Sequence, residues 1–89
     1  MPVRIIDHAR ERMAERDVTE EEVLECLSSG LILDAKGERK AKEAVFPFNS
    51  HWRGRYCEQK KVRVIYVEEG PDTVVITVYS FFGHFEAER

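Results

Sequence analysis

Two stretches of this sequence carry side chains that can handle an RNA phosphodiester. Three lie at four-residue spacing near the N-terminus and three lie in the last third: His8, Arg12, Arg16, Lys61, Arg63 and Tyr79. Metal-independent cleavage needs a base for the 2′-hydroxyl, cations for the phosphorane oxygens and an acid for the leaving 5′-oxygen. His8 can serve as base or acid, because an ordinary imidazole titrates at about pH 6.5. We predict a catalytic set of His8, Arg12, Arg63 and Tyr79.

The other residues of this prediction bind the nucleic acid. Arginine holds phosphate in a bidentate fork, and a tyrosine ring stacks on a base or takes part in proton transfer. Trp52 adds an aromatic ring next to two cations, a mixture typical of nucleic-acid surfaces. The predicted nucleic-acid-binding residues are Arg16, Arg53, Arg55 and Lys61.

Each of these residues also has an ordinary structural interpretation. His8 can be a surface residue of a first helical turn, and the helical arginines can pair with neighbouring glutamates. The cations of the last third can be solvent-facing strand residues. Tyr79 can pack across a strand pair, and Trp52 can belong to the core. The residue types alone leave both interpretations open.

Charge is distributed unevenly along the chain. The 89 residues have a net charge of −3, which by itself argues against a strong nucleic-acid binder. Residues 36–63, however, contain nine Lys or Arg and only three acidic side chains. Such a block creates a local field that attracts phosphate, although strand edges also use Lys and Arg for solubility.

A first helix is predicted over residues 8–16. Asp7 is a candidate N-cap, and Ala9 and Met13 form a short apolar stripe at i and i+4. The predicted basic stripe runs along another side of the same helix.

A second helix begins with a capping box, because Glu22 follows Thr19 by three residues. Val18 and Val23 have the spacing of a hydrophobic staple, and Gly30 is a candidate C-terminal cap. The predicted buried residues of this helix are Val23, Leu24 and Leu27. The glutamates of the first turn suit the helix dipole, so we assign them no catalytic role.

Short extended runs follow the second helix. We predict strands over residues 31–34 and 44–48, with a polar loop at 35–43 and a turn at 49–54. Pro47 confines its strand to an edge or a bulge.

The clearest strand pattern is a hairpin of residues 61–67 and 73–81 with a five-residue loop between them. If Val67 pairs with Thr73, one face is uniformly apolar and should be the core face. This face contains Val62, Val64, Tyr66, Val74, Ile76 and Val78.

The other face of this hairpin then holds Lys61 opposite Tyr79 and Arg63 opposite Thr77. A register slip of two residues preserves both faces, whereas a slip of one would bury Arg63. The alternation therefore predicts that these cations point away from the core.

These elements predict a single α+β domain over residues 1–89, with two N-terminal helices on an antiparallel sheet of about four strands. No apolar run is long enough for a membrane helix and no secretory signal is present, so we expect a cytoplasmic protein without membrane contact. Cys26 and Cys57 are expected to be free, buried thiols. Neither a cofactor motif nor metal-ligand spacing is present, so we predict no cofactor and no metal.

Three motifs are familiar. Residues 8–16 read His-Ala-Arg-Glu-Arg-Met-Ala-Glu-Arg, residues 18–23 read Val-Thr-Glu-Glu-Glu-Val, and residues 77–79 read Thr-Val-Tyr. Over nearly the whole chain the sequence resembles the bacterial family called domain of unknown function 4258. Asp17 stands where that family usually has a glycine, at a helix end where Asp tolerates the left-handed conformation.

The helix–helix–sheet order resembles that of the RelE/ParE toxin superfamily, which includes metal-independent ribonucleases acting on messenger RNA and gyrase-binding poisons. This resemblance implies a fold more than an activity. Together with the His8 and Arg12 stripe, the polar hairpin face and the basic block, it leads us to expect a toxin-like, RNA-directed protein or a metal-independent endoribonuclease, with RNA and an antitoxin as candidate partners. A pI of about 5.6 departs from the strongly basic RelE-type toxins and argues against ribosome-dependent cleavage.

The alternative is a non-enzymatic protein-interaction module of the same fold, for example a homodimer. A small domain has difficulty burying five phenylalanines, which are Phe46, Phe48, Phe81, Phe82 and Phe85. A metal-binding role ranks third.

Overall fold

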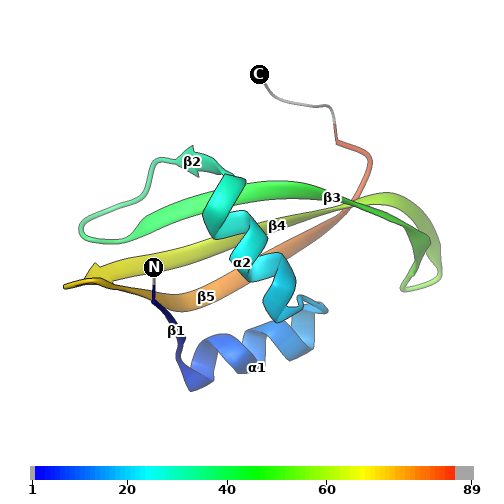
Figure 1. Cartoon of the computed structure of the whole chain (residues 1–89). Coiled ribbons are helices and arrows are strands. Elements are labelled where there is room, and N and C mark those ends of the chain that lie inside the picture. The colour runs from blue at the N-terminus through cyan, green and yellow to red at the C-terminus, as the bar shows by residue number, and fades with distance from the viewer. Residues whose placement is uncertain (1, 86–89) are drawn as a thin grey trace.

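The computed structural model of this protein describes residues 2–85 and has two helices on one face of a five-stranded sheet (Figure 1). In chain order the elements are β1 (Val3–Ile5), α1 (Asp7–Arg16), α2 (Glu20–Ser29), β2 (Leu31–Leu33), β3 (Lys40–Trp52), β4 (Arg55–Glu69) and β5 (Asp72–Gly83). The strands lie in the order β1-β5-β4-β3-β2. Neither helix of the described chain has the length and apolarity that a membrane span requires.

The predicted α+β class is confirmed, but three of its details are wrong. The sheet has five strands rather than four, and β1 precedes both helices. β1 is parallel to β5, with Val3 opposite Thr73, so the sheet is mixed rather than antiparallel. A three-residue strand whose partner lies about seventy residues away leaves no local pattern from which it could be predicted.

No side chain caps either end of α1. Its N-cap is Ile6, so the predicted cap, Asp7, is instead the first helical residue and acts only through the helix dipole. At the other end Asp17 adopts φ 57°, the left-handed conformation expected there, and its N–H bonds to the Met13 carbonyl. Ala9 and Met13 are buried, as predicted.

α2 has the predicted capping box. The Glu22 N–H donates to Thr19 Oγ1 at 3.1 Å, and the Thr19 N–H donates to Glu22 Oε1 at 3.0 Å. Val23 is buried as predicted, but Leu24 is exposed and Cys26 takes its place in the core.

Gly30 ends α2 for a different reason from the predicted one. Its φ of −72° is extended, so no left-handed cap exists there. A Cβ at Gly30 would clash with the Cys26 carbonyl oxygen and lie 2.9 Å from the Glu43 carbonyl oxygen. Glycine therefore lets β3 pass close to the end of α2.

The β4–β5 hairpin is longer and tighter than predicted. Glu69 pairs with Asp72, so the turn is Gly70-Pro71 rather than a five-residue loop. Over most of the ladder the register is two residues away from the predicted one, and Arg63 lies opposite Tyr79. This shift preserves the faces.

Near the turn, a bulge changes the inward-facing residues of β5. The register shifts at Ile65 and Tyr66, so that Val75, rather than the predicted Val74 or Ile76, lies opposite Tyr66 in the core.

β3 is longer than the predicted strand at residues 44–48 and extends into the predicted loop and the predicted turn on either side of it. It includes part of the predicted loop at residues 35–43 and of the turn at 49–54, and only Arg53 and Gly54 separate it from β4. Pro47 lies beyond the stretch that β2 covers and at a register shift, so its edge and bulge prediction is confirmed.

The core lies between the two helices and the middle of β4 and β5. It consists of Ala9, Met13, Val18, Val23, Cys26, Leu27, Val62, Val64, Tyr66, Val75 and Val78. Cys26 and Cys57 are free and buried, as predicted. Because both helices pack on this face, strand alternation leaves the opposite face of the sheet, here called the open face, without a covering helix (Figure 1).

Candidate functional site

Two rows of side chains cross the open face of β3, β4 and β5. In the first row Glu43 lies opposite Arg63, which lies opposite Tyr79. In the second row Val45 lies opposite Lys61, which lies opposite Phe81. Cross-strand neighbours of this kind lie close enough for their side chains to interact. The sheet therefore brings together cations, one carboxylate and two aromatic rings from three strands.

Glu43 pairs with both cations of these rows. Arg63 contacts Glu43 Oε1 through Nη2 at 2.7 Å and Nε at 2.9 Å, and Lys61 Nζ lies 3.7 Å from Glu43 Oε2. The carboxylate is largely shielded, since its side chain is only 14% exposed. Two cations therefore share one anion, and a single positive charge remains on this part of the sheet.

Aromatic rings stack against the same cations. The Arg63 guanidinium lies 5.1 Å from the Phe81 ring centroid, and Lys61 Nζ lies 4.5 Å from that of Phe85. Tyr79 and Phe81 remain 40% and 39% exposed. Half-exposed rings next to cations form a surface on which a flat, charged ligand can stack.

Arg16 joins this surface from α1. Its Nη1 donates to the Val78 carbonyl oxygen at 2.9 Å, and its guanidinium lies 5.0 Å from the Tyr79 ring. In return, Ser80 Oγ donates to the Arg16 carbonyl oxygen at 2.8 Å. These contacts fix the end of α1 to the edge of β5. The aromatic–basic patch is defined here as Arg16, Lys61, Arg63, Tyr79 and Phe81.

The remaining predicted residues of α1 lie apart from this patch. Arg12 pairs with Glu15 and, at 3.6 Å, with Glu11, as the ordinary structural interpretation predicts. Its Nε is buried and has no partner among residues 2–85. His8 is exposed, and within the described chain no hydrogen bond or ion pair joins it to Arg63 or Tyr79. Of the predicted catalytic set, Arg63 and Tyr79 therefore lie together, whereas His8 and Arg12 do not join them.

The predicted binding residues Arg53 and Arg55 lie at the other hairpin, between β3 and β4. Arg53 is in the turn with φ 54°, and its guanidinium lies 5.3 Å from the Trp52 ring. Trp52 is half-buried and stacks on Phe82, with centroids 4.2 Å apart and planes at 14°. Trp52 is therefore neither a core residue nor a free ring, and Arg55, its register partner, is exposed.

Phe81 and Glu43 belong to this site but were not among the predicted catalytic or nucleic-acid-binding residues. Phe81 could have been found, because it is two residues from Tyr79 and must share its face. Glu43 could not, because residues 35–43 read as a polar loop and its pairing with Arg63 is set by the sheet.

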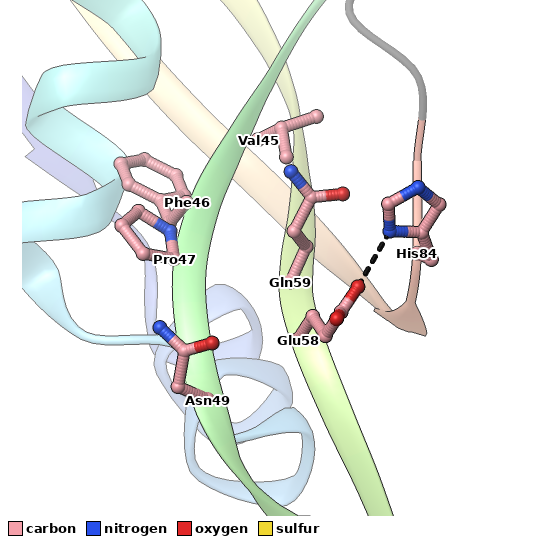
Figure 2. A pocket seen from close by; sticks show the side chains of 7 residues that line it. All are labelled: Val45, Phe46, Pro47, Asn49, Glu58, Gln59 and His84. Atoms are coloured by element: carbon pink, nitrogen blue, oxygen red, sulfur yellow. Dashed lines mark hydrogen bonds and ion pairs between the residues drawn. The ribbon is translucent and has the colours of Figure 1, made fainter.

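A second missed feature is a histidine–carboxylate pair next to a shallow cavity (Figure 2). His84 Nδ1 and Glu58 Oε1 lie 2.7 Å apart, and both side chains are mostly exposed. The cavity, of about 290 Å³, is lined by Val45, Phe46, Pro47, Asn49, Glu58, Gln59 and His84. Solvent screens such a pair, so it adds little stability.

Potential metal ligands and the Cys26 thiol can be judged from the described residues. Within residues 2–85, no three His, Cys, Asp or Glu side chains are grouped so that they could hold a metal ion. Burial raises the pKa of the Cys26 thiol to about 11. Cys26 is therefore protonated at neutral pH and is a poor nucleophile.

Comparison with known families accounts for most of the chain. The model of the family described as domain of unknown function DUF4258 matches residues 5–80. The chain belongs to the DUF4258 family. The match includes all three recognised motifs, from His8 to Tyr79. Searches of curated proteins and of solved structures found no significant match. The likeness of this DUF4258 protein to RelE/ParE toxins thus stays a prediction.

Proposed function

We propose that this DUF4258 protein binds single-stranded RNA on its open face. One observation carries the proposal: two half-exposed aromatic rings, Tyr79 and Phe81, lie side by side on the open face, with cations on both sides. Unpaired bases stack on such rings, and every base offers a flat face. The neighbouring cations, Arg16, Lys61 and Arg63, then meet the phosphates.

The charge of the patch suits moderate, salt-sensitive binding. Glu43 neutralises part of Lys61 and Arg63, and the whole chain is acidic at −3. Affinity for a single strand falls with salt in proportion to the number of phosphates neutralised. A patch with few free cations is expected to bind with micromolar rather than nanomolar affinity.

Fluorescence anisotropy of a labelled single-stranded RNA tests the binding. Replacing Tyr79 or Phe81 with alanine should weaken binding by about 5- to 150-fold, because one stacked base contributes roughly 1–3 kcal/mol. Tyr56→Ala is the matched control, since Tyr56 is 53% exposed but lies at the β3–β4 hairpin end, outside the patch. Equal affinities of wild type and both patch variants would refute the proposal.

The catalytic form of this proposal assigns cleavage to His8. His8 would take the proton of the 2′-hydroxyl as the 2′-oxygen bonds to phosphorus. This step requires His8 and Arg12, which lie apart from the patch in the structure, to reach the phosphate that Arg63 holds. The bond from phosphorus to the 5′-oxygen then breaks, and Tyr79 returns a proton to that oxygen. Incubation with RNA in EDTA tests this step. Cleavage that persists unchanged in His8→Ala and Arg12→Ala, or none by wild type, would exclude it.

A toxin role adds a protein partner to this proposal. An antitoxin that covers the aromatic–basic patch would protect Tyr79 and Phe81 from solvent. The test is to co-express the protein with the product of the neighbouring gene and to measure RNA binding by the complex. RNA binding by the complex as tight as that by the protein alone would contradict this role.

A second candidate is self-association through the edge strand β2. Of the five phenylalanines that favour an interaction module, Phe46 packs on the core and Phe48 contacts Phe82, so the fold itself accommodates these side chains. Instead, Ile32 is 78% exposed on β2, which ends the sheet. An apolar edge strand invites pairing with another copy. Light scattering should then detect a dimer that Ile32→Lys dissociates, whereas a monomeric wild type rejects this candidate.

A further inference from the structure

A second cavity lies between the end of α1 and the far end of the β3–β4 hairpin. In Figure 1 this hairpin end curves down toward the level of α1. The cavity measures about 230 Å³ and is lined by Glu15, Arg16, Trp52, Arg53, Ser80 and Phe82. Arg16 belongs both to this cavity and to the aromatic–basic patch, so the two sites are continuous around the edge of β5.

The wall of this cavity is an ordered aromatic stack. Phe82 is held by an edge contact from Phe48 at 5.0 Å and lies under Trp52 at 4.2 Å. The Arg53 guanidinium is the next layer, 5.3 Å from the Trp52 ring. An arginine in an exposed turn can move aside, because few contacts hold it. A nucleobase would extend the stack in the same way that the guanidinium does now.

Two polar side chains of the cavity, Glu15 and Arg16, are of opposite charge and lie on the same helix. The Arg16 guanidinium is held by the Val78 carbonyl oxygen and the Tyr79 ring, and its remaining N–H groups can donate to a phosphate or a base carbonyl. Glu15 pairs with Arg12 through one oxygen, Oε1, and its side chain is 56% exposed. Oε2 has no partner within the described chain and Oε1 keeps a second lone pair, so both oxygens of this carboxylate can accept a hydrogen bond from a ligand.

This donor and acceptor pattern distinguishes the bases. Guanine presents two adjacent donors, N1–H and the 2-amino group, which a carboxylate can accept together. Adenine presents one donor next to an acceptor nitrogen, and that nitrogen would face the carboxylate unfavourably. Uracil presents its single donor between two carbonyl oxygens. A base read on this edge while stacked on an aromatic ring is a common form of recognition.

We propose that this cavity takes one guanine base of the bound RNA, stacked on Trp52 and read by Glu15, with Arg16 and Arg53 at its phosphate. The inference rests on the proposed RNA binding, because the strand would pass from the patch around the edge of β5 into the cavity. The volume is below the roughly 300–1,000 Å³ of pockets for drug-sized ligands, which suits a single base.

The chain contains a reporter at the site, because Trp52 is its one tryptophan. Titration with 5′-GMP should quench Trp52 emission, and 5′-AMP, 5′-CMP and 5′-UMP should bind at least about five-fold more weakly, the low end for a bidentate contact to a base. Inorganic phosphate should not quench. Equal quenching by all four nucleotides, or quenching by phosphate alone, overturns the assignment of guanine.

Glu15→Gln tests the carboxylate. It keeps a hydrogen bond for Arg12 but replaces one acceptor with a donor, so GMP binding should weaken at least about five-fold while AMP binding does not. Glu21→Gln changes the charge equally on an exposed residue of α2 and should alter neither. Loss of GMP binding in both variants would show a charge effect and overturn the role of Glu15.

Anisotropy of labelled RNA separates this inference from the proposed function. A uridine oligomer with one central guanosine should bind more tightly than the same oligomer without it. If both bind equally and GMP does not quench Trp52, the open face binds RNA and the guanine site is wrong. If GMP quenches selectively but neither oligomer binds, the cavity is a mononucleotide site, and the RNA-binding proposal and this link to it both fail.

Discussion

Glu43 gives the sharpest test of the aromatic–basic patch. Its carboxylate lies between Lys61 and Arg63 and accepts from Arg63 at 2.7 and 2.9 Å. Glu43→Gln keeps the shape and one acceptor oxygen but removes the negative charge. We expect two opposite effects, a less stable protein and tighter RNA binding.

Both magnitudes follow from the contacts. The neutral amide loses the charge-assisted part of its bonds to Arg63, so the free energy of unfolding should fall by about 1 kcal/mol. One more cation becomes available for phosphate, which steepens the slope of log K against log salt by about 0.7 on a single strand. With that slope, the affinity of Glu43→Gln relative to wild type should be about five-fold higher at 0.1 M salt than at 1 M salt.

The assay is anisotropy of labelled single-stranded RNA at four salt concentrations, with urea unfolding for stability. Glu21→Gln makes the same change of net charge on α2, away from the patch, and should give neither effect. Weaker RNA binding by Glu43→Gln, or equal gains in both variants, would refute the reasoning that phosphate meets Lys61 and Arg63.

Three further predictions concern stability. Lys60 is 4% exposed and donates to Glu22 at 2.8 Å, so Lys60→Met should lower the free energy of unfolding in urea by about 3 kcal/mol. Adding Glu22→Gln to this variant should recover part of the lost stability. Gly30→Ala should cost about 1–3 kcal/mol, because its methyl group meets the Cys26 and Glu43 carbonyls; an unchanged midpoint would contradict the close approach. Burial raises the pKa of Cys26 from 9.0 to about 11, so the thiol ionises more readily in the unfolded chain. The free energy of unfolding should therefore fall by about 2–3 kcal/mol as the pH rises from 9.0 to about 11. Cys26→Ala should lose that pH dependence, and an identical slope in both proteins would rule it out.

Local patterns predicted the helical part of the fold well. The capping box of Thr19 and Glu22, the buried stripe of Ala9 and Met13 and the left-handed Asp17 all depend on residues within one or two turns. Leu24 was misplaced, because the orientation of α2 depends on the sheet beneath it and not on its own periodicity alone.

The candidate site was predicted in part. Alternation along β4 and β5 placed Lys61, Arg63 and Tyr79 away from the core, and a register error of two residues did not disturb that result. The stripe of α1 was predicted as one unit, but only Arg16 reaches the patch, because Arg12 is closer to its own helical glutamates.

The sequence by itself determined family membership, the two helices and the side of the last hairpin on which its cations lie. These features depend on short motifs, capping and a two-residue period, all of which operate between near neighbours in the chain. Only the tertiary structure decided that β1 pairs with β5 and that Glu43 neutralises Lys61 and Arg63. It also decided that Trp52 meets Phe82 at the end of α1. Such contacts join segments far apart in sequence, and their geometry depends on strand pairing and sheet curvature, which no local pattern specifies.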